Sequence, residues 1–265
     1  MPDLESKEFT MSSILQEFVQ ALKSRKVEII DMSHTLQPAT PVIQLPEPFN
    51  QTLPFRIEEI SNFDERGPNW YWNNIHLGEH TGTHFDAPIH WITGRDYPDG
   101  SVDKIPAEKL IAPAIVIDVT AKVDADDEYL MTLDDVKAWE DEHGMIPEGA
   151  WVLVRTGWQS RYPTEKFLDN SRWPGQHPDV PGFLAHERKV IGVGTEPVGT
   201  DAGAAHSFET RWPCHHHMHG TNRYGLSSLA NMDKLPATGA VLITPPLKII
   251  KGSGSPCRVL ALVER

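Results

Sequence analysis

The stretch IAPAIVIDV, residues 111–119, is a short and almost uninterrupted apolar run, which predicts a buried strand. A second apolar run, WVLVRTGW (151–158), predicts another strand of the same kind. Further strands are predicted around these two, at 27–36, 53–60, 70–77, 190–194, 240–249 and 257–264. Because strands outnumber helices and the helices are short, the sequence favours an α/β or α+β protein with a β-sheet core. We predict the α/β class.

Helices are predicted at two places. Thr132 begins TLDDVKAWEDEHG, with a threonine N-cap, acidic residues in the first turn and Gly144 at the end. Spaced apolar residues near the start predict an N-terminal helical arm within residues 1–26. The chain has no internal repeat and no linker, and 160–182 is predicted to be a proline-rich loop. We therefore expect a single domain over residues 1–265.

Composition narrows the class of protein. Among 265 residues, 24 Lys and Arg stand against 37 Asp and Glu, for a formal net charge of −13. Such an acidic chain is repelled by nucleic acid and by anionic membrane surfaces, so neither is an expected partner. Two cysteines are too few for a disulfide framework, and the sequence shows neither a secretory signal nor an apolar run long enough to cross a membrane. We expect a cytoplasmic protein.

The chemistry concentrates in EHTGTHFDAPIHW, residues 79–91, which contains His80, His84, Asp86 and His90. Their spacing is even throughout, so on one extended strand all four would share a face. A glycine and a proline inside the stretch leave a loop that gathers the side chains as the alternative. Two imidazoles and a carboxylate are ligands for a divalent metal, and three protein ligands leave positions open for water. Ordinary polar histidines are the competing interpretation.

A second histidine cluster, CHHHMHGTNRYG, occupies residues 214–225. Its histidines are candidates for metal ligands, for substrate donors or for a solvated loop. Two of them, His216 and His217, are expected to be structural or exposed. Cys214 matches no nucleophile motif, so we expect a small buried thiol there.

The segment HTGTHFDAPIH resembles HxGTHxDxPxH, the signature of the cyclase family of metal-dependent hydrolases. This family includes kynurenine formamidase, isatin hydrolase and trans-dienelactone hydrolase. DMSHTLQPATP near the start, VRTGW at 154–158 and LANMDKLP at 229–236 resemble further family segments, the last in the isatin hydrolase branch. The resemblance extends over residues 27–264. It implies a swivelling β/β/α fold and a homo-oligomer, a dimer or tetramer.

Carried over by position, the resemblance implies that His80, His84 and Asp86 are metal ligands. It also implies that His90 is the general acid and base. Water activated by the metal would attack the carbonyl of a cyclic amide or lactone. The isatin hydrolase branch implies one divalent metal, Mn²⁺, with Zn²⁺ as the alternative. Some formamidases hold a second metal with a glutamate, and Ala230 stands where that glutamate is expected, which argues for a single metal.

The same resemblance implies a substrate pocket. His215 and His219 would line it, and Ser228 would lie near the substrate. Glu196 is assigned either to the site, as a further metal ligand or a polar pocket residue, or to a structural loop. Aromatic residues in the predicted strand 70–77 are usually core, and Trp72 is the one that we expect to face a cleft and a flat substrate.

Three alternatives to a cyclic amide hydrolase remain open. Two are enzymes: an arylformamidase acting on N-formylkynurenine, which the residue at position 230 disfavours, and a trans-dienelactone hydrolase. The third is a metal-dependent small-molecule binding protein, which would not need a proton carrier at His90.

Overall fold

A nine-stranded mixed sheet runs through the computed structural model of the protein, which describes residues 13–265. The four central strands are parallel, and the strands at both sides of them run antiparallel. In spatial order the strands are β1 (Val27–Asp31), β13 (Leu260–Glu264), β11 (Ala240–Ile243), β5 (Ile111–Asp118), β7 (Trp151–Arg155), β9 (Gly192–Thr195), β10 (Tyr224–Ser227), β4 (His84–Asp86) and β12 (Gly254–Pro256). The predicted α/β class with a sheet core is confirmed.

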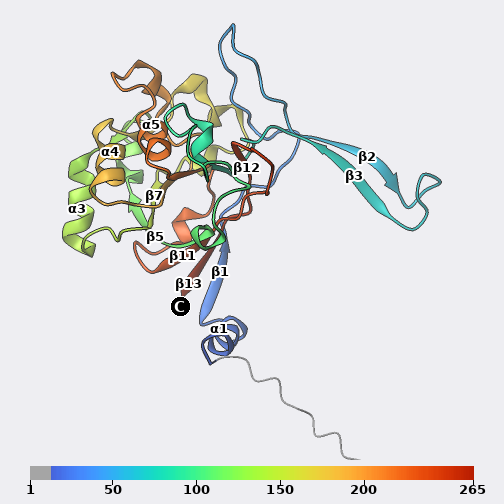
Figure 1. Ribbon diagram of the computed structural model, residues 1–265, viewed down its shortest axis with the longest axis horizontal. Helices are drawn as coiled ribbons and strands as arrows, with labels where there is room; N and C mark the ends of the chain where they lie inside the picture. The colour runs from blue at the N-terminus through green and yellow to red at the C-terminus, as the bar shows by residue number, and fades with distance from the viewer. Residues whose placement is uncertain (1–12) are drawn as a thin grey trace, which may run out of the picture.

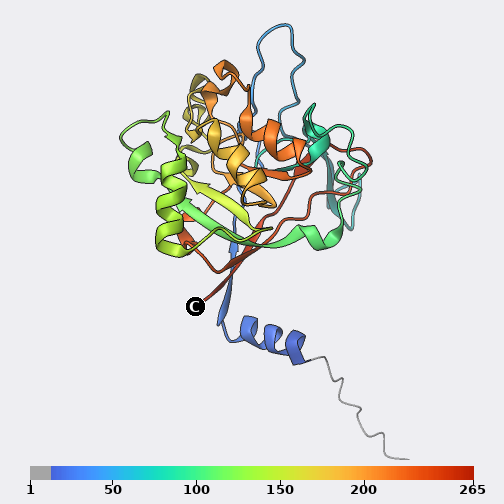
Figure 2. The ribbon, with the colours of Figure 1, turned by 60° about the vertical axis from the view of Figure 1, so that its left-hand side comes forward.

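Helices cover one face of this sheet. Side chains alternate along β5 and β7, so Ile115 and Val152 point to one face while Val116 and Leu153 point to the other. Three helices pack on the face of Ile115: α3 (Leu133–His143), α4 (Asp179–His186) and α5 (Pro213–Gly220). Figure 2 shows these helices stacked on the same side of the sheet.

The opposite face of the sheet closes on itself. Ile30 of β1, Phe85 of β4 and Ala261 of β13 belong to one hydrophobic cluster, although their strands lie toward opposite ends of the strand order. Residues from both ends of the sheet can share a cluster only if the sheet is strongly curled. Strand β4, which contains part of the histidine motif, is thereby held between β10 and β12 at the rim of this core.

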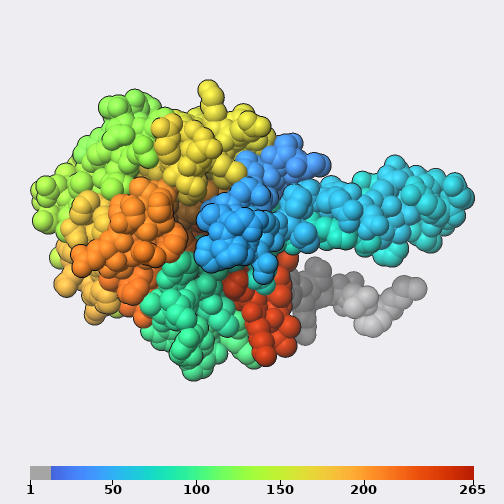
Figure 3. All heavy atoms as spheres, turned by 90° about the horizontal axis from the view of Figure 1, so that it is seen from above, coloured from blue at the N-terminus to red at the C-terminus, as the bar shows by residue number. Residues whose placement is uncertain are grey.

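Two elements project from the body (Figure 1). One is the hairpin of β2 (Arg56–Asn62) and β3 (Tyr71–His76), which also stands out in the space-filling view (Figure 3). Its aromatic residues Trp70, Tyr71 and Trp72 are 48–55% exposed, so the expectation of core aromatics is wrong for Trp70 and Tyr71. The other is helix α1 (Ser13–Lys23), which has no buried residue and lies within the predicted arm of residues 1–26. The remainder of that predicted arm lies outside the described residues.

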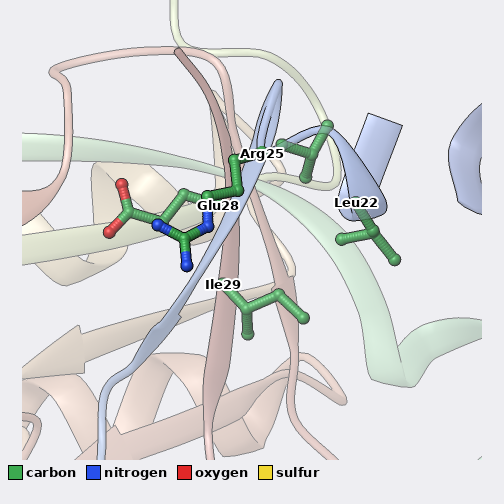
Figure 4. Close-up of a pocket in the computed structure, with 5 residues that line it drawn as sticks. Leu22, Arg25, Glu28 and Ile29 are labelled. Atoms are coloured by element: carbon green, nitrogen blue, oxygen red, sulfur yellow. The ribbon is translucent and has the colours of Figure 1, made fainter. Parts of the chain in front are cut away.

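A surface hollow of about 470 Å³ lies where α1 meets β1. It is lined by Leu22, Arg25, Val27, Glu28 and Ile29, and Figure 4 shows its side chains. None of these residues is a histidine or a cysteine, so the hollow offers no soft metal ligand. Among residues 13–265, no helix combines the length and the apolar character needed to cross a membrane.

Local signals predicted some elements well and others not at all. The helix at 132–144 is confirmed, with a capping box between Thr132 and Asp135 and with Gly144 at a φ of +88°. The long predicted strands are present but shorter. Helices α4 and α5 and strands β4, β10 and β12 were not predicted, and α4 begins inside the expected loop. The remaining short elements are α2 (Thr120–Val123), β6 (Leu130–Met131) and β8 (Gly175–Gln176).

His34 makes the stability of the fold depend on pH. Its ring stacks on Tyr162 with centroids 3.8 Å apart, and its Nε2 is buried without a hydrogen-bond partner among the described residues. Burial lowers the pKa of His34 to about 4, whereas an unfolded histidine has a pKa of about 6.5. Between these values the unfolded chain binds a proton that the folded chain does not, so the free energy of unfolding falls as the pH falls.

We predict that His34→Phe, which keeps the stacked ring, reduces this acid sensitivity. The free energy of unfolding of the variant should fall less than that of the wild type between about pH 7 and about pH 5. Urea unfolding at the two pH values measures the difference. Equal losses in both proteins would contradict the assignment.

Candidate metal site and active site

The four motif residues come from three adjoining pieces of backbone. His80 lies in a turn, His84 and Asp86 are the first and last residues of β4, and His90 ends the 3₁₀ helix η1 (Pro88–His90). Gly82 has a φ of +63°, a left-handed conformation that favours glycine, and it bends the chain between His80 and the strand. A single strand carrying all four residues is therefore wrong, and the loop alternative describes the arrangement better.

His80, His84 and Asp86 bring three donor atoms together. The distance from His80 Nδ1 to Asp86 Oδ1 is 2.7 Å, and His84 Nε2 lies 3.4 Å from the same oxygen. His84 Nδ1 donates to the carbonyl oxygen of Gly82 at 2.7 Å, which leaves a lone pair on Nε2. These two imidazole nitrogens and one carboxylate oxygen fit a divalent metal in donor type.

The strands beside Asp86 leave room for its carboxylate. Gly225 of β10 and Gly254 of β12 are both paired in register with Asp86. A Cβ at Gly225 would lie 2.8 Å from Asp86 Oδ2, and one at Gly254 would lie 2.6 Å from the Cε1 atom of His80. Both glycines are therefore needed for the close approach of backbone to the donor side chains.

The charges of the cluster match those of metal ligands. Burial raises the pKa of Asp86, but His84 and the hydrogen-bonded His80 outweigh it and hold that pKa well below its ordinary value. Burial lowers the pKa of His84. At neutral pH the carboxylate is therefore ionised and the His84 imidazole is neutral, which are the states that bind metal.

The second histidine cluster forms helix α5, so the solvated-loop alternative is wrong. His215 and His219 are four residues apart and share one helix face. Together with Asp86 they form a second group whose ligand atoms lie within 4.8 Å of one another. His217 instead packs against His186, with ring centroids 5.7 Å apart. The i, i+4 spacing and a proline at the first helical position were signals that could have predicted this helix.

Asp201 holds helix α5 and orients His215, and sequence analysis did not single it out. Its carboxylate accepts from the backbone N–H of Cys214 at 2.7 Å and of His215 at 3.1 Å. The same carboxylate lies 2.5 Å from His215 Nδ1. Burial lowers the pKa of His215, but the bond to Asp201 outweighs burial and raises that pKa above its ordinary value. His215 thus keeps a proton on Nδ1 near neutral pH.

His219 and His90 are, like His84, neutral histidines of the site. His219 Nδ1 donates to the carbonyl oxygen of Arg223 at 3.0 Å, and burial lowers the pKa of His219 to about 4. The ring of His90 lies on that of His80, with centroids 3.9 Å apart and planes 30° apart. Burial, followed by the nearby His80, lowers the pKa of His90 well below its ordinary value. Both rings are therefore neutral at neutral pH, and each keeps one nitrogen with a free lone pair.

Glu196 makes contacts that fix the backbone. Its Oε2 accepts from the backbone N–H of Thr156 at 2.8 Å and of Trp158 at 3.0 Å, which ties the end of β9 to the turn after β7. Burial raises the pKa of Glu196. These contacts agree with a structural role for Glu196, which was one of its two predicted assignments. Its other oxygen is buried without a partner among residues 13–265.

Ser228 and Trp72 are the remaining predicted site residues, and Ser227 is a residue that the prediction missed. Ser228 has a φ of +53°, and its carbonyl oxygen accepts from the Thr83 hydroxyl at 2.5 Å. Ser227 was missed: it is paired in register with His84, so the two side chains share a face of the sheet. The Ser227 hydroxyl is buried, and no described residue is its hydrogen-bond partner. Trp72 lies on the projecting hairpin, outside the histidine cluster.

Comparisons with known proteins agree with this site. The Cyclase family matches residues 30–202. The isatin hydrolase of Roseibium aggregatum is 48% identical over 250 residues, which cover 92% of this chain and 95% of that protein. The kynurenine formamidase of Salinibacter ruber is 28% identical over 234 residues, 88% and 96% of the two chains.

Solved structures show the same fold. Isatin hydrolase A from Ralstonia solanacearum superposes with a TM-score of 0.94 at 50% identity, over 96% of this chain and 99% of that one. An isatin hydrolase bound to the product analogue thioisatinate superposes with a TM-score of 0.93 at 46% identity, over 97% and 100%. The chain belongs to the cyclase family of metal-dependent hydrolases. Within that family it is similar to the isatin hydrolases in both sequence and fold.

We predict that replacing His80, His84 or Asp86 by Ala removes the bound metal, because each supplies one of three donor atoms. Elemental analysis of the purified variants measures this, and activity should disappear with the metal. His76→Ala is the matched control, since His76 is a histidine of the hairpin that bonds to Glu58. Wild-type metal content in any of the three variants would refute its ligand role.

Proposed function

We propose that this protein hydrolyses the C–N bond of a small cyclic amide of the isatin type. The observation that carries the proposal is the buried donor set of His80, His84 and Asp86 with the neutral His90 stacked against it. The 48% identity to an isatin hydrolase supports the choice of a cyclic amide. Ring opening would give a single product, in which the former ring nitrogen is an amine and the former amide carbonyl is a carboxylate.

One divalent metal is assigned to the three donors. We propose Mn²⁺, with Zn²⁺ as the alternative, on the resemblance to the isatin hydrolase branch. When bound, the metal supplies a Lewis acid that lowers the pKa of water and stabilises negative charge on oxygen. Ala230 supports a single metal, since its methyl side chain offers no ligand and its backbone N–H donates to the carbonyl oxygen of Met32 at 2.8 Å.

His90 carries the proton. As a neutral imidazole it can take a proton from the attacking water and return it to the ring nitrogen that leaves the carbonyl. Its position over His80 places it beside the donor set without making it part of that set. Burial lowers the pKa of His90, so its ring is unprotonated at neutral pH and has the lone pair that a general base needs.

We assign two histidines of α5 to substrate binding. His215, protonated on Nδ1 toward Asp201, is oriented to donate from Nε2 to a carbonyl or carboxylate oxygen. The lone pair of His219 Nε2 suits the N–H of a cyclic amide. Trp91 lies 4.8 Å from the His215 ring and offers aromatic surface for a flat substrate. Ser228 is proposed as a further substrate contact.

An arylformamidase, a trans-dienelactone hydrolase and a non-catalytic binding protein are the alternatives. A sample of known metal content, assayed against cyclic amides, lactones and N-formylkynurenine, distinguishes them. Preferred turnover of the cyclic amide supports the proposal, and preferred turnover of the formamide or lactone refutes it. Tight binding of these compounds without turnover would identify a binding protein.

We predict that His90→Ala separates metal binding from turnover. Metal content should stay at the wild-type level, because the three donor residues are intact. The rate should fall by roughly 10²–10⁴-fold, the usual contribution of general acid–base catalysis. Metal analysis and a ring-opening assay on the same variant test this. Loss of metal would make His90 a ligand, and a near-normal rate would leave it with a packing role only.

We also propose that the chain is a homo-oligomer, a dimer or tetramer, assembled through the projecting hairpin. Ile57 and Ile75 are paired across β2 and β3 and are 49% and 62% exposed. An isolated two-stranded hairpin is marginally stable in water, so this apolar ribbon is expected to pack on a second copy. In that arrangement we propose that Trp72 faces a flat substrate in the site of the partner copy. The two free, buried cysteines support a reducing, cytoplasmic location.

We predict that Ile75→Lys weakens self-association by about tenfold or more, because it places a charge in the apolar contact. Sedimentation over a range of concentrations measures this against the single-chain mass of 29.7 kDa. Met145→Lys is the control, since Met145 is 74% exposed beyond the end of α3. A wild-type protein that sediments as a single chain would refute the oligomer.

A further inference from the structure

His80 is held at both of its ring nitrogens. Nδ1 faces Asp86 Oδ1 at 2.7 Å, and Nε2 lies 2.9 Å from the hydroxyl oxygen of Ser253. Ser253 comes directly before β12 and is 173 residues from His80 in the chain. The contact therefore depends on the tertiary fold and not on the local motif.

Glu79 sets the direction of the hydrogen bond at Ser253. Its Oε2 accepts from the Ser253 hydroxyl at 2.5 Å and from the Ser253 backbone N–H at 3.1 Å. A carboxylate only accepts, so the single hydroxyl proton points to Glu79. The Ser253 oxygen is then left as an acceptor toward His80, and His80 Nε2 must carry the proton of that bond.

The consequence lies at the other nitrogen of His80. Because Nε2 keeps its proton, Nδ1 is the nitrogen whose lone pair is available. Without a proton on Nδ1, three lone-pair atoms converge: His80 Nδ1, His84 Nε2 and Asp86 Oδ1. Two acceptors at 2.7 Å repel each other unless a proton or a metal ion lies between them, and a metal ion that binds here takes the place of the proton that bonds His80 Nδ1 to Asp86. The contact beside Gly254, where a Cβ would lie 2.6 Å from the ring, leaves the imidazole little freedom to turn away.

We propose that Glu79 and Ser253 are positioning residues that fix the tautomer of His80 and direct Nδ1 to the metal. They act through His80 and need no contact with substrate. This inference rests on the proposed function, because it assumes that the donor set holds a divalent metal. It adds two residues outside the histidine motif to the metal site. Outer partners of this kind typically change metal affinity by 10–100-fold.

Calorimetric titration of metal-stripped protein with MnCl₂ tests the proposal. Ser253→Ala and Glu79→Ala should each weaken binding by about 10–100-fold. The double variant should bind about as well as Ser253→Ala alone, because Glu79 acts through the hydroxyl that is already absent. Glu79→Gln, which keeps an acceptor oxygen, should bind more tightly than Glu79→Ala. The melting temperature of the stripped proteins should change little.

The controls are Glu58→Gln, an exposed carboxylate bonded to His76, and Ser160→Ala, an exposed hydroxyl bonded to the carbonyl oxygen of Gly157. Both should bind Mn²⁺ like the wild type. If the wild type binds and Ser253→Ala binds equally well, the positioning role is refuted while the proposed function stands. Additive losses in the double variant would also refute it. A wild-type protein that binds no divalent metal would refute the proposed function itself.

Discussion

A buried carboxylate is the constraint on which the rest of this structure depends. Asp86 is 1% exposed, and an unpaired charge at such a site costs on the order of several kcal/mol. The chain places His80 within hydrogen-bond distance of this carboxylate, His84 beside it, and a glycine opposite it on each neighbouring strand. Polar groups farther out, such as Asp201, orient the surrounding histidines. The same arrangement that makes the charge tolerable gives it the affinity for a cation.

The sequence predicted the elements whose capping residues or apolar pattern lie within one short stretch of the chain. The helix at 132–144 has its cap, its acidic first turn and its terminating glycine within one short stretch, and β5 and β7 are plain apolar runs. Strands β4, β10 and β12 have only three or four residues each, and their stability comes from pairing with distant segments. Helix α5 lacks an apolar stripe because one of its faces serves the site.

The same distinction applies to the site. The spacing of His80, His84 and Asp86 within the motif was enough to predict that they lie together, since the motif is compact and specific. Asp201, Ser227 and Ser253 were out of reach because no local pattern ties them to the motif. Their contacts arise from strand register and from a helix end, which only the fold supplies. The hairpin aromatics were misjudged because exposure of a strand depends on what packs beside it.

The position of β4 between β10 and β12 has a consequence for the order of folding. The motif lies at residues 80–90, yet both neighbours of β4 come from residues 224–256. His80 and Ser253 are separated by 173 positions, so a long loop must close before the donor atoms are enclosed. A nascent chain that has not released its last strands from the ribosome therefore carries the histidines without the site. Enclosure of the donor atoms is therefore a late event in folding, because it must wait for β10 and β12.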